Sequence, residues 1–192
     1  PKREDVPPAG PLTLSEEQQA AFDGLNRQMM QEKPGAALLY GVTGSGKTSV
    51  YFALIRSALD AGRSTMLLVP EIALTPQLLH KMTAHFGKAV AVLHSSLRVG
   101  ERYDEWRRIA RGEARVVVGT RSAVFAPLEN LGLIILDEEQ EHTYKSENAP
   151  RYHAREIALY RGAKAGALVL FGSATPSIET MYLAKTGVYS LY

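Results

Sequence analysis

The feature that most constrains the fold is a short apolar run that leads directly into a glycine-rich loop. Residues 36–40 (AALLY) are short and apolar enough to form a buried strand. Residues 41–48 follow as GVTGSGKT, with the spacing G-x-x-x-x-G-K-[ST], and then open a helix. A strand, loop and helix in this order indicate a site for the phosphates of a nucleoside triphosphate. The open alternative is a Gly/Ser loop that only turns a strand into a helix.

Each residue type in this loop has a chemical reason to be there. Glycine lets a phosphate approach the backbone N–H groups, and a following helix directs its positive end at the anion. Lys47 can reach the β and γ phosphates, and the Thr48 hydroxyl is suited to Mg²⁺. The predicted nucleotide-binding residues of this stretch are Gly41, Thr43, Gly44, Ser45, Gly46, Lys47, Thr48 and Ser49.

Six strand-length apolar runs alternate with helical patterns along the chain. After residues 36–40 they lie at 65–69, 89–93, 115–119, 131–136 and 167–172. Near-continuous apolar strands that alternate with helices predict an α/β fold: a parallel β-sheet with helices on both faces. The helix expected at 101–111 carries an apolar stripe, which we interpret as core packing, formed by Tyr103, Trp106, Ile109 and Ala110. At the first helix, Ser15 is a candidate N-cap and Gln18 has the capping-box spacing.

A polar cluster follows every one of these runs. Because parallel strands end at one edge of a sheet, we expect all six clusters to share that edge, where ligands bind. Hydroxyl and charged side chains there suit sugar-phosphate contacts, with strand-end capping as the open alternative. The predicted contacts from two of the clusters are His94, Ser95, Thr120 and Arg121. Residues 173–175 (SAT) can bond the neighbouring carboxylates and link them to the rest of the edge.

Two adjacent carboxylates follow the fifth run. Asp137 is predicted to bind the Mg²⁺ touched by Thr48, and Glu138 to orient or deprotonate an attacking water. The predicted catalytic residues are therefore Lys47, Asp137 and Glu138, and the open alternative is a solvated acidic turn. The second carboxylate favours hydrolysis over a kinase reaction, and the chain has neither an Asn-Lys-x-Asp guanine reader nor a Leu-Ser-Gly-Gly-Gln signature.

Composition sets the class of molecule. A chain of 192 residues, 45% hydrophobic and 22% charged, is near the size of one large folded domain. We expect a linker at 1–11 and the domain at 12–192. No apolar run approaches the length of a membrane span, and the absence of cysteine fits a cytoplasmic protein. The net charge of +2 does not by itself identify a nucleic-acid binder.

With these residues placed, the chain resembles the first motor lobe of superfamily 2 helicases, and among them the PriA family of bacterial replication-restart helicases. The resemblance runs from about residue 12 to 192. Its most specific stretches are LVPEIALTPQ at 68–77 and RYHARE at 151–156. The others are GVTGSGKTSVY at 41–51, VLHSSL at 92–97, GTRSAVFAPL at 119–128, DEEQ at 137–140 and GSATPSIET at 172–180.

The resemblance implies a RecA-like P-loop fold and an ATP-dependent 3′–5′ DNA helicase that acts in primosome assembly and replication-fork restart. It implies that Gln18 contacts adenine and that residues 142–151 form an aromatic-rich loop coupling DNA binding to ATP hydrolysis. Aromatic faces stack on bases and cations hold phosphates. The implied coupling residues are Gln140, Tyr144, Lys145, Arg151, Tyr152, Ser173 and Thr175. Two departures are Gln140, where the family usually has His, and Ala149-Pro150, where an aromatic is frequent.

The implied partners are single-stranded and forked DNA, a second motor lobe of the same protein, single-stranded-DNA-binding protein and other primosome proteins. The family's zinc belongs to a cysteine-rich region that this chain lacks, and we expect the isolated lobe to hydrolyse ATP slowly. Two alternatives stay open. One is the lobe of a double-stranded DNA translocase, and the other is a non-catalytic scaffold that binds nucleotide or a partner protein.

Overall fold

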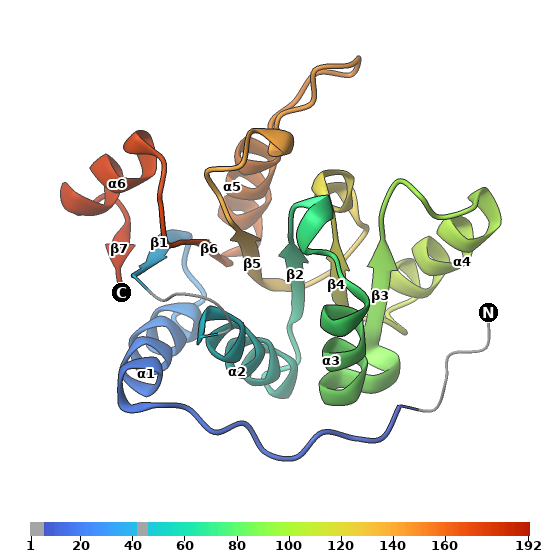
Figure 1. Cartoon of the computed structure of the whole chain (residues 1–192), viewed down its shortest axis with the longest axis horizontal. Coiled ribbons are helices and arrows are strands. Elements are labelled where there is room, and N and C mark those ends of the chain that lie inside the picture. Colours follow the sequence, from blue (N-terminus) through green and yellow to red (C-terminus); the bar gives the residue numbers. More distant parts are fainter. Residues whose placement is uncertain (1–5, 42–45) are drawn as a thin grey trace.

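A computed structural model describes residues 6–41 and 46–192. They form a seven-stranded sheet in the order β3-β4-β2-β5-β6-β1-β7, and every pairing is parallel. The carboxyl ends of the strands therefore lie at one edge of the sheet, and the strand direction rotates from β3 to β7 because the sheet twists (Figure 1). The strands are β1 Gly35–Tyr40, β2 Ser64–Leu68, β3 Val90–Leu93, β4 Val116–Gly119, β5 Leu131–Asp137, β6 Leu168–Ser173 and β7 Ser190–Leu191.

Helices cover both faces of this sheet. Buried residues of α1, α2 and α3 belong to one core cluster, and buried residues of α4, α5 and α6 belong to the other. The predicted α/β fold, a parallel sheet with helices on both faces, is confirmed. The helices are α1 Glu16–Met30, α2 Gly46–Asp60, α3 Pro76–Phe86, α4 Val99–Ala110, α5 Ala154–Ala165 and α6 Ile178–Lys185.

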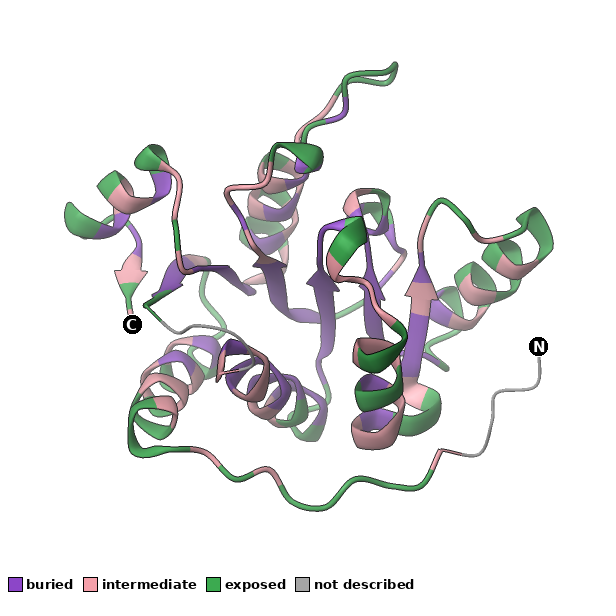
Figure 2. Ribbon diagram, in the orientation of Figure 1, coloured by how far each residue is buried: buried purple, intermediate pink, exposed green. Residues whose placement is uncertain are grey.

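Alternation along the strands separates the two cores. In β6, Leu168 and Leu170 face the α1–α3 core, whereas Val169 and Phe171 face the opposite one. Successive side chains of a strand point to opposite faces, and covering both faces buries both sets. The sheet is accordingly buried along its centre (Figure 2). No helix in the described residues is long and apolar enough to cross a membrane.

Side-chain caps fix where the helices begin. The amide of Gln18 donates to Ser15 Oγ at 3.2 Å and the amide of Ser15 donates to Gln18 Oε1 at 2.8 Å, which confirms the predicted capping box at α1. Thr75 caps α3, where Pro76 lies in the first turn and needs no N–H partner. Before α1 the chain is extended, and the amide of Ala9 donates to the Ala84 carbonyl of α3.

Two parts of the fold differ from the sequence-based expectation. Helix α6 and the two-residue strand β7 at the sheet edge were not predicted. The prediction that the apolar stripe of α4 packs in the core was wrong. Only Ile109 is buried, while Tyr103 is 61% and Trp106 is 39% exposed. Because α4 lies against β3 at the edge of the sheet, only a narrow side of the helix meets the core.

Candidate nucleotide and nucleic-acid site

The six predicted polar clusters do share one edge, because all the strands are parallel. At its centre, the end of β5 brings two carboxylates to the first turn of α2. Lys47 Nζ donates to Glu138 Oε1 at 2.9 Å and lies 3.9 Å from Asp137 Oδ1. Lys47 is buried, but the Glu138 side chain is 36% exposed, so solvent screens the Lys47–Glu138 contact in part. The three predicted catalytic residues thus lie together.

Tyr51 lies at this site, although sequence reasoning did not single it out. Its buried hydroxyl donates to Asp137 Oδ1 at 2.7 Å. The signal was available, because Lys47 and Tyr51 are four residues apart and share one face of α2. Tyr51 therefore orients the carboxylate that is predicted to bind the metal.

The environment moves the pKa values of the two carboxylates apart. Burial raises the pKa of Asp137 despite the Tyr51 hydrogen bond and the nearby Lys47. Burial also opposes ionisation of Glu138, but hydrogen bonds from Gln140 and Lys47 lower the pKa of that group. The lowered pKa favours the charged form of Glu138, the form in which a carboxylate accepts a proton from water.

The predicted magnesium site can be tested by its donors. Thr48 and Asp137 line the same cavity of about 220 Å³ beside the first turn of α2. Hydroxyl and carboxylate oxygens are the donors that Mg²⁺ takes, and it usually keeps several waters as well. These residues fit the ion.

The rest of the nucleotide set is only partly visible. Thr43, Gly44 and Ser45 lie outside the described residues. Gly41 directly follows β1 and has φ 84°, a backbone angle that suits glycine. Gln18 Nε2 donates to the Gly46 carbonyl at 3.1 Å, which places Gln18 at the phosphate loop. Its adenine contact and the role of Ser49 stay predictions.

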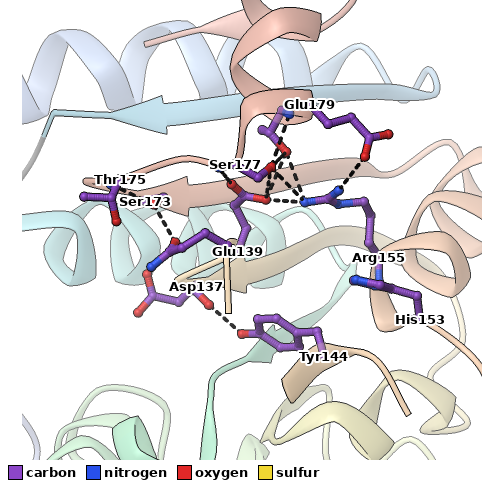
Figure 3. Close-up of polar contacts among 11 residues, drawn as sticks. Asp137, Glu139, Tyr144, His153, Arg155, Ser173, Thr175, Ser177 and Glu179 are labelled. Atoms are coloured by element: carbon purple, nitrogen blue, oxygen red, sulfur yellow. Dashed lines mark hydrogen bonds and ion pairs between the residues drawn. The ribbon is translucent and has the colours of Figure 1, made fainter. Parts of the chain in front are cut away.

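Gln140 carries the link between β5 and β6. Gln140 Nε2 donates to Glu138 Oε2 at 2.8 Å, and Ser173 Oγ donates to Gln140 Oε1 at 2.5 Å. Ser173 Oγ in turn accepts the Thr175 amide at 2.9 Å (Figure 3). The expected bonds from residues 173–175 to the carboxylates are not direct and run through Gln140 instead. Gln140 takes the place of the usual family His without breaking the link.

Tyr144 is not the exposed stacking platform that the resemblance suggested. Its side chain is buried, with 1% of the residue exposed. Its hydroxyl contacts the carbonyls of Leu68 at 3.0 Å and Asp137 at 2.5 Å. Burial also raises the pKa of Tyr144, so the hydroxyl stays protonated and able to donate. The ring cannot stack on a base in this arrangement, but the hydroxyl ties the segment after β5 to the tips of β2 and β5.

The segment 145–152 projects from the same edge as a narrow hairpin (Figure 1). The Ser146 amide donates to the Tyr152 carbonyl at 2.7 Å across its base. Lys145 and Arg151 are exposed. Tyr152 is half-buried, and its ring packs edge-on against Phe125 at 4.8 Å. The coupling role of these residues stays a prediction.

A groove of about 870 Å³ opens beside the hairpin, over the ends of β2, β3 and β4. All four predicted sugar-phosphate residues line it: His94, Ser95, Thr120 and Arg121. So does Trp106, which sequence reasoning had assigned to the core. Arg121 donates to the carbonyls of Thr143 at 3.0 Å and Lys145 at 3.2 Å.

Several of these groups already have partners within the chain. Ser95 Oγ donates to Glu71 Oε1 at 3.0 Å, and the Ser96 amide donates to His94 Nδ1 at 3.2 Å. Thr120 is buried at the groove floor. These internal contacts agree with the strand-end capping alternative, and binding of nucleic acid by these residues stays a prediction.

Comparison with known proteins identifies the family of this chain. A family model described as DEAD/DEAH box helicase matches residues 15–183. The chain belongs to this helicase family. It is also 51% identical over 181 residues to "Replication restart protein PriA" of Bacillus subtilis, and 48% identical over 176 residues to that of Treponema pallidum. These matches cover 94% and 91% of the present chain but only 22% and 26% of the two relatives. The chain therefore spans about a quarter of the length of these relatives.

Solved helicase structures agree. A structure titled "Structure of RecG bound to three-way DNA junction" superimposes with a TM-score of 0.70 at 26% identity, over 97% of this chain and 26% of that one. A hypothetical ATP-dependent RNA helicase from Sulfolobus tokodaii matches with a TM-score of 0.64 at 19% identity, over 95% of this chain and 53% of that one. The second likeness concerns the fold alone. Both support the predicted RecA-like helicase fold.

Proposed function

We propose that this chain is the ATP-binding first motor lobe of a PriA-type DNA helicase. The full-length protein would couple ATP hydrolysis to 3′–5′ unwinding in primosome assembly and replication-fork restart. The observation that carries the proposal is the continuous contact from Lys47 through Glu138 and Gln140 to Ser173. It connects the first turn of the phosphate-loop helix to the end of β6. A protein that only binds nucleotide needs no such connection, whereas a motor must connect its nucleotide site to the rest of the lobe.

Each residue has a defined part in the proposed reaction. Lys47 binds the β and γ phosphates, and its three N–H donors allow it to keep Glu138 at the same time. Glu138 orients the attacking water and takes its proton, while Asp137 and Thr48 hold the metal. Bound Mg²⁺ would neutralise charge that develops on the phosphates. A transition-state arginine would come from the second lobe, a contribution of about 10³–10⁵ in rate, so the isolated chain would turn over slowly.

The groove at the ends of β2, β3 and β4 is the proposed path of single-stranded DNA. Its apolar ring, Trp106, lies with the cationic Arg121 and the hydroxyl of Ser95. Stacking surfaces and phosphate-binding groups together are what a sequence-independent strand path requires. The proposed further partners are forked DNA, the second lobe, single-stranded-DNA-binding protein and other primosome proteins, in the cytoplasm.

The test is ATP turnover by the full-length protein without DNA, with single-stranded DNA and with a forked substrate. We expect both DNAs to stimulate turnover. A double-stranded DNA translocase would respond to the forked substrate, which contains duplex, but not to single-stranded DNA. Turnover that none of these DNAs changes would refute the proposed motor function.

The variant Glu138→Gln separates catalysis from scaffolding. It should retain ATP binding and lose about 10²–10⁴ in kcat, because a positioned general base contributes that much. Glu113→Gln is the matched control, since Glu113 is exposed and precedes β4, at the opposite edge of the sheet. Unchanged turnover in Glu138→Gln would contradict the catalytic role of Glu138 and favour the non-catalytic scaffold.

A further inference from the structure

Glu139 follows the two catalytic carboxylates but points into a different part of the molecule. Glu138 has φ 49°, a left-handed angle that is uncommon outside glycine and costs about 1–2 kcal/mol. This turn lets neighbouring side chains diverge. Glu138 meets Lys47, while the Glu139 side chain is 0% exposed and faces α5 and α6. The Glu139 amide also donates to the Gly172 carbonyl at 3.1 Å.

One carboxylate therefore holds two helices. Glu139 Oε1 accepts the Ser177 amide at 2.7 Å, at the start of α6, where the helix dipole favours an anion. Oε2 accepts the Thr180 hydroxyl at 2.9 Å and pairs with Nη2 of Arg155. Figure 3 shows Arg155 entering this cluster from α5, between Glu139 and Glu179.

Arg155 lies at the junction between α5 and the projecting hairpin. It is the second residue of α5, and His153, which caps that helix, bridges to Lys145 across the hairpin base. At the other end of the same segment, Arg121 of the groove holds the carbonyls of Thr143 and Lys145. A DNA strand that displaced Arg121 or moved the hairpin would thus also move Arg155.

Packing alone does not account for an ion pair at this place. Burying two charges costs several kcal/mol per ion, and apolar residues of similar volume are often equally stable. Arg155 also leaves its Nε buried without a hydrogen-bond partner among the described residues, an unusual deficit. Filling this space therefore does not by itself require the two charges, and the carboxylate belongs to the residue next to Glu138.

We infer that Glu139 and Arg155 are a positioning pair that transmits the position of the 142–152 segment to the catalytic turn at Asp137 and Glu138. The inference rests on the proposed function. The route runs from the groove through Arg121 to the hairpin, then through Arg155 and Glu139 to the backbone of Glu138. Both residues act through the turn and not on the reacting atoms.

The test uses the full-length protein with the variants Glu139→Gln, Arg155→Lys and the double variant Glu139→Gln/Arg155→Met. Glu179→Gln is the control, because it removes the exposed contact of the same arginine, where the Glu179 side chain is 73% exposed. The double variant removes both charges together, so no unpaired ion is left in the core. For each protein, ATP turnover with and without single-stranded DNA, DNA affinity and thermal unfolding are measured.

We expect stimulation of turnover by DNA to fall about tenfold, a usual size for a coupling free energy. DNA affinity should change little, and basal turnover should fall by a smaller factor because the catalytic turn loses one support. Arg155→Lys should retain more of the stimulation by DNA than the double variant, because lysine keeps the positive charge. Hydrogen exchange gives a readout besides activity. DNA should alter exchange of the 138–141 amides in the wild type and in Glu179→Gln, but only exchange of the hairpin in the double variant.

Two outcomes would overturn the pair. One is full DNA stimulation in a folded double variant. The other is basal and stimulated turnover falling together in proportion to the unfolded fraction, which is the behaviour of a purely structural contact. A wild type that ignores DNA would instead remove the proposed function and the coupling role with it.

Discussion

The hydroxyl of Tyr51 lies 2.7 Å from Oδ1 of Asp137, which joins the second turn of α2 to the tip of β5. Gly172 of β6 pairs with Asp137 and leaves room for this contact, since a Cβ at Gly172 would lie 1.6 Å from the Tyr51 hydroxyl. A tyrosine, an aspartate and a glycine from three elements thus set the direction of one carboxylate. The first two predictions follow from it.

Tyr51→Phe should raise the Mg²⁺ concentration for half-maximal ATP turnover by about tenfold, because removing an outer partner of a metal ligand typically costs 10–100-fold. The measurement is a magnesium titration of turnover at saturating ATP. Tyr160→Phe is the matched control, as Tyr160 is exposed and its ring contacts Lys164 on the surface of α5. Identical magnesium curves for wild type and Tyr51→Phe would remove Tyr51 from the site.

Gly172→Ala should destabilise the chain by about 1–3 kcal/mol, since overpacking forces side chains out of their rotamers. Tyr51 must move, so the Mg²⁺ requirement should rise as well. Urea unfolding measures the first effect. Gly100→Ala is the control, because no atom lies within 4 Å of a Cβ there. Equal unfolding free energies for Gly172→Ala and wild type would contradict the close approach.

Trp106→Ala should weaken single-stranded DNA binding roughly five- to hundredfold, the usual cost of losing one stacked base, and leave DNA-independent turnover unchanged. Fluorescence anisotropy of labelled DNA measures the affinity. The control is Tyr103→Ala on the same helix, since Tyr103 is exposed but does not line the groove. Because Trp106 is the only tryptophan of the chain, its own fluorescence should also respond to DNA. Equal losses of DNA affinity in Trp106→Ala and Tyr103→Ala would mean that the DNA strand does not bind in this groove.

His153 should make stability depend on pH. Its Nδ1 accepts the Arg155 amide at 3.1 Å, and burial and the Arg155 charge lower the pKa of the ring, with Lys145 adding to this and Glu156 and Glu179 opposing it. A folded-state pKa below the unfolded value of about 6.5 means that the unfolded chain takes up the proton first. Stability from this group is therefore present above that value and is lost as pH falls through it toward the folded-state pKa.

The variant His153→Asn keeps a good N-cap that does not titrate. The measurement is the difference in unfolding free energy between wild type and variant from pH 7.5 to 5.5. The unfolding free energy of the wild type should decrease relative to that of the variant as pH falls. A difference that is constant over this range would show that His153 does not titrate differently in the folded and unfolded states.

The sequence by itself determined six of the seven strands and the catalytic edge, because their signals are local. A buried strand shows as an apolar run, and parallel strands bring the residues after each run to one edge. Lys47, Asp137 and Glu138 could therefore be placed together without knowing which strands are neighbours. The capping box at Ser15 was equally readable, since its partners are three residues apart.

Only the tertiary structure decided where side chains in turns and at sheet margins point. Tyr144 and Trp106 exchanged their expected places because burial at an edge depends on what lies opposite, which is a contact between distant parts of the chain. Glu139 reads as one more acid beside Glu138, yet a left-handed turn sends it into a buried cluster with Arg155, 16 residues further on. Such directions follow from the full set of long-range contacts, so no local pattern of residues could give them.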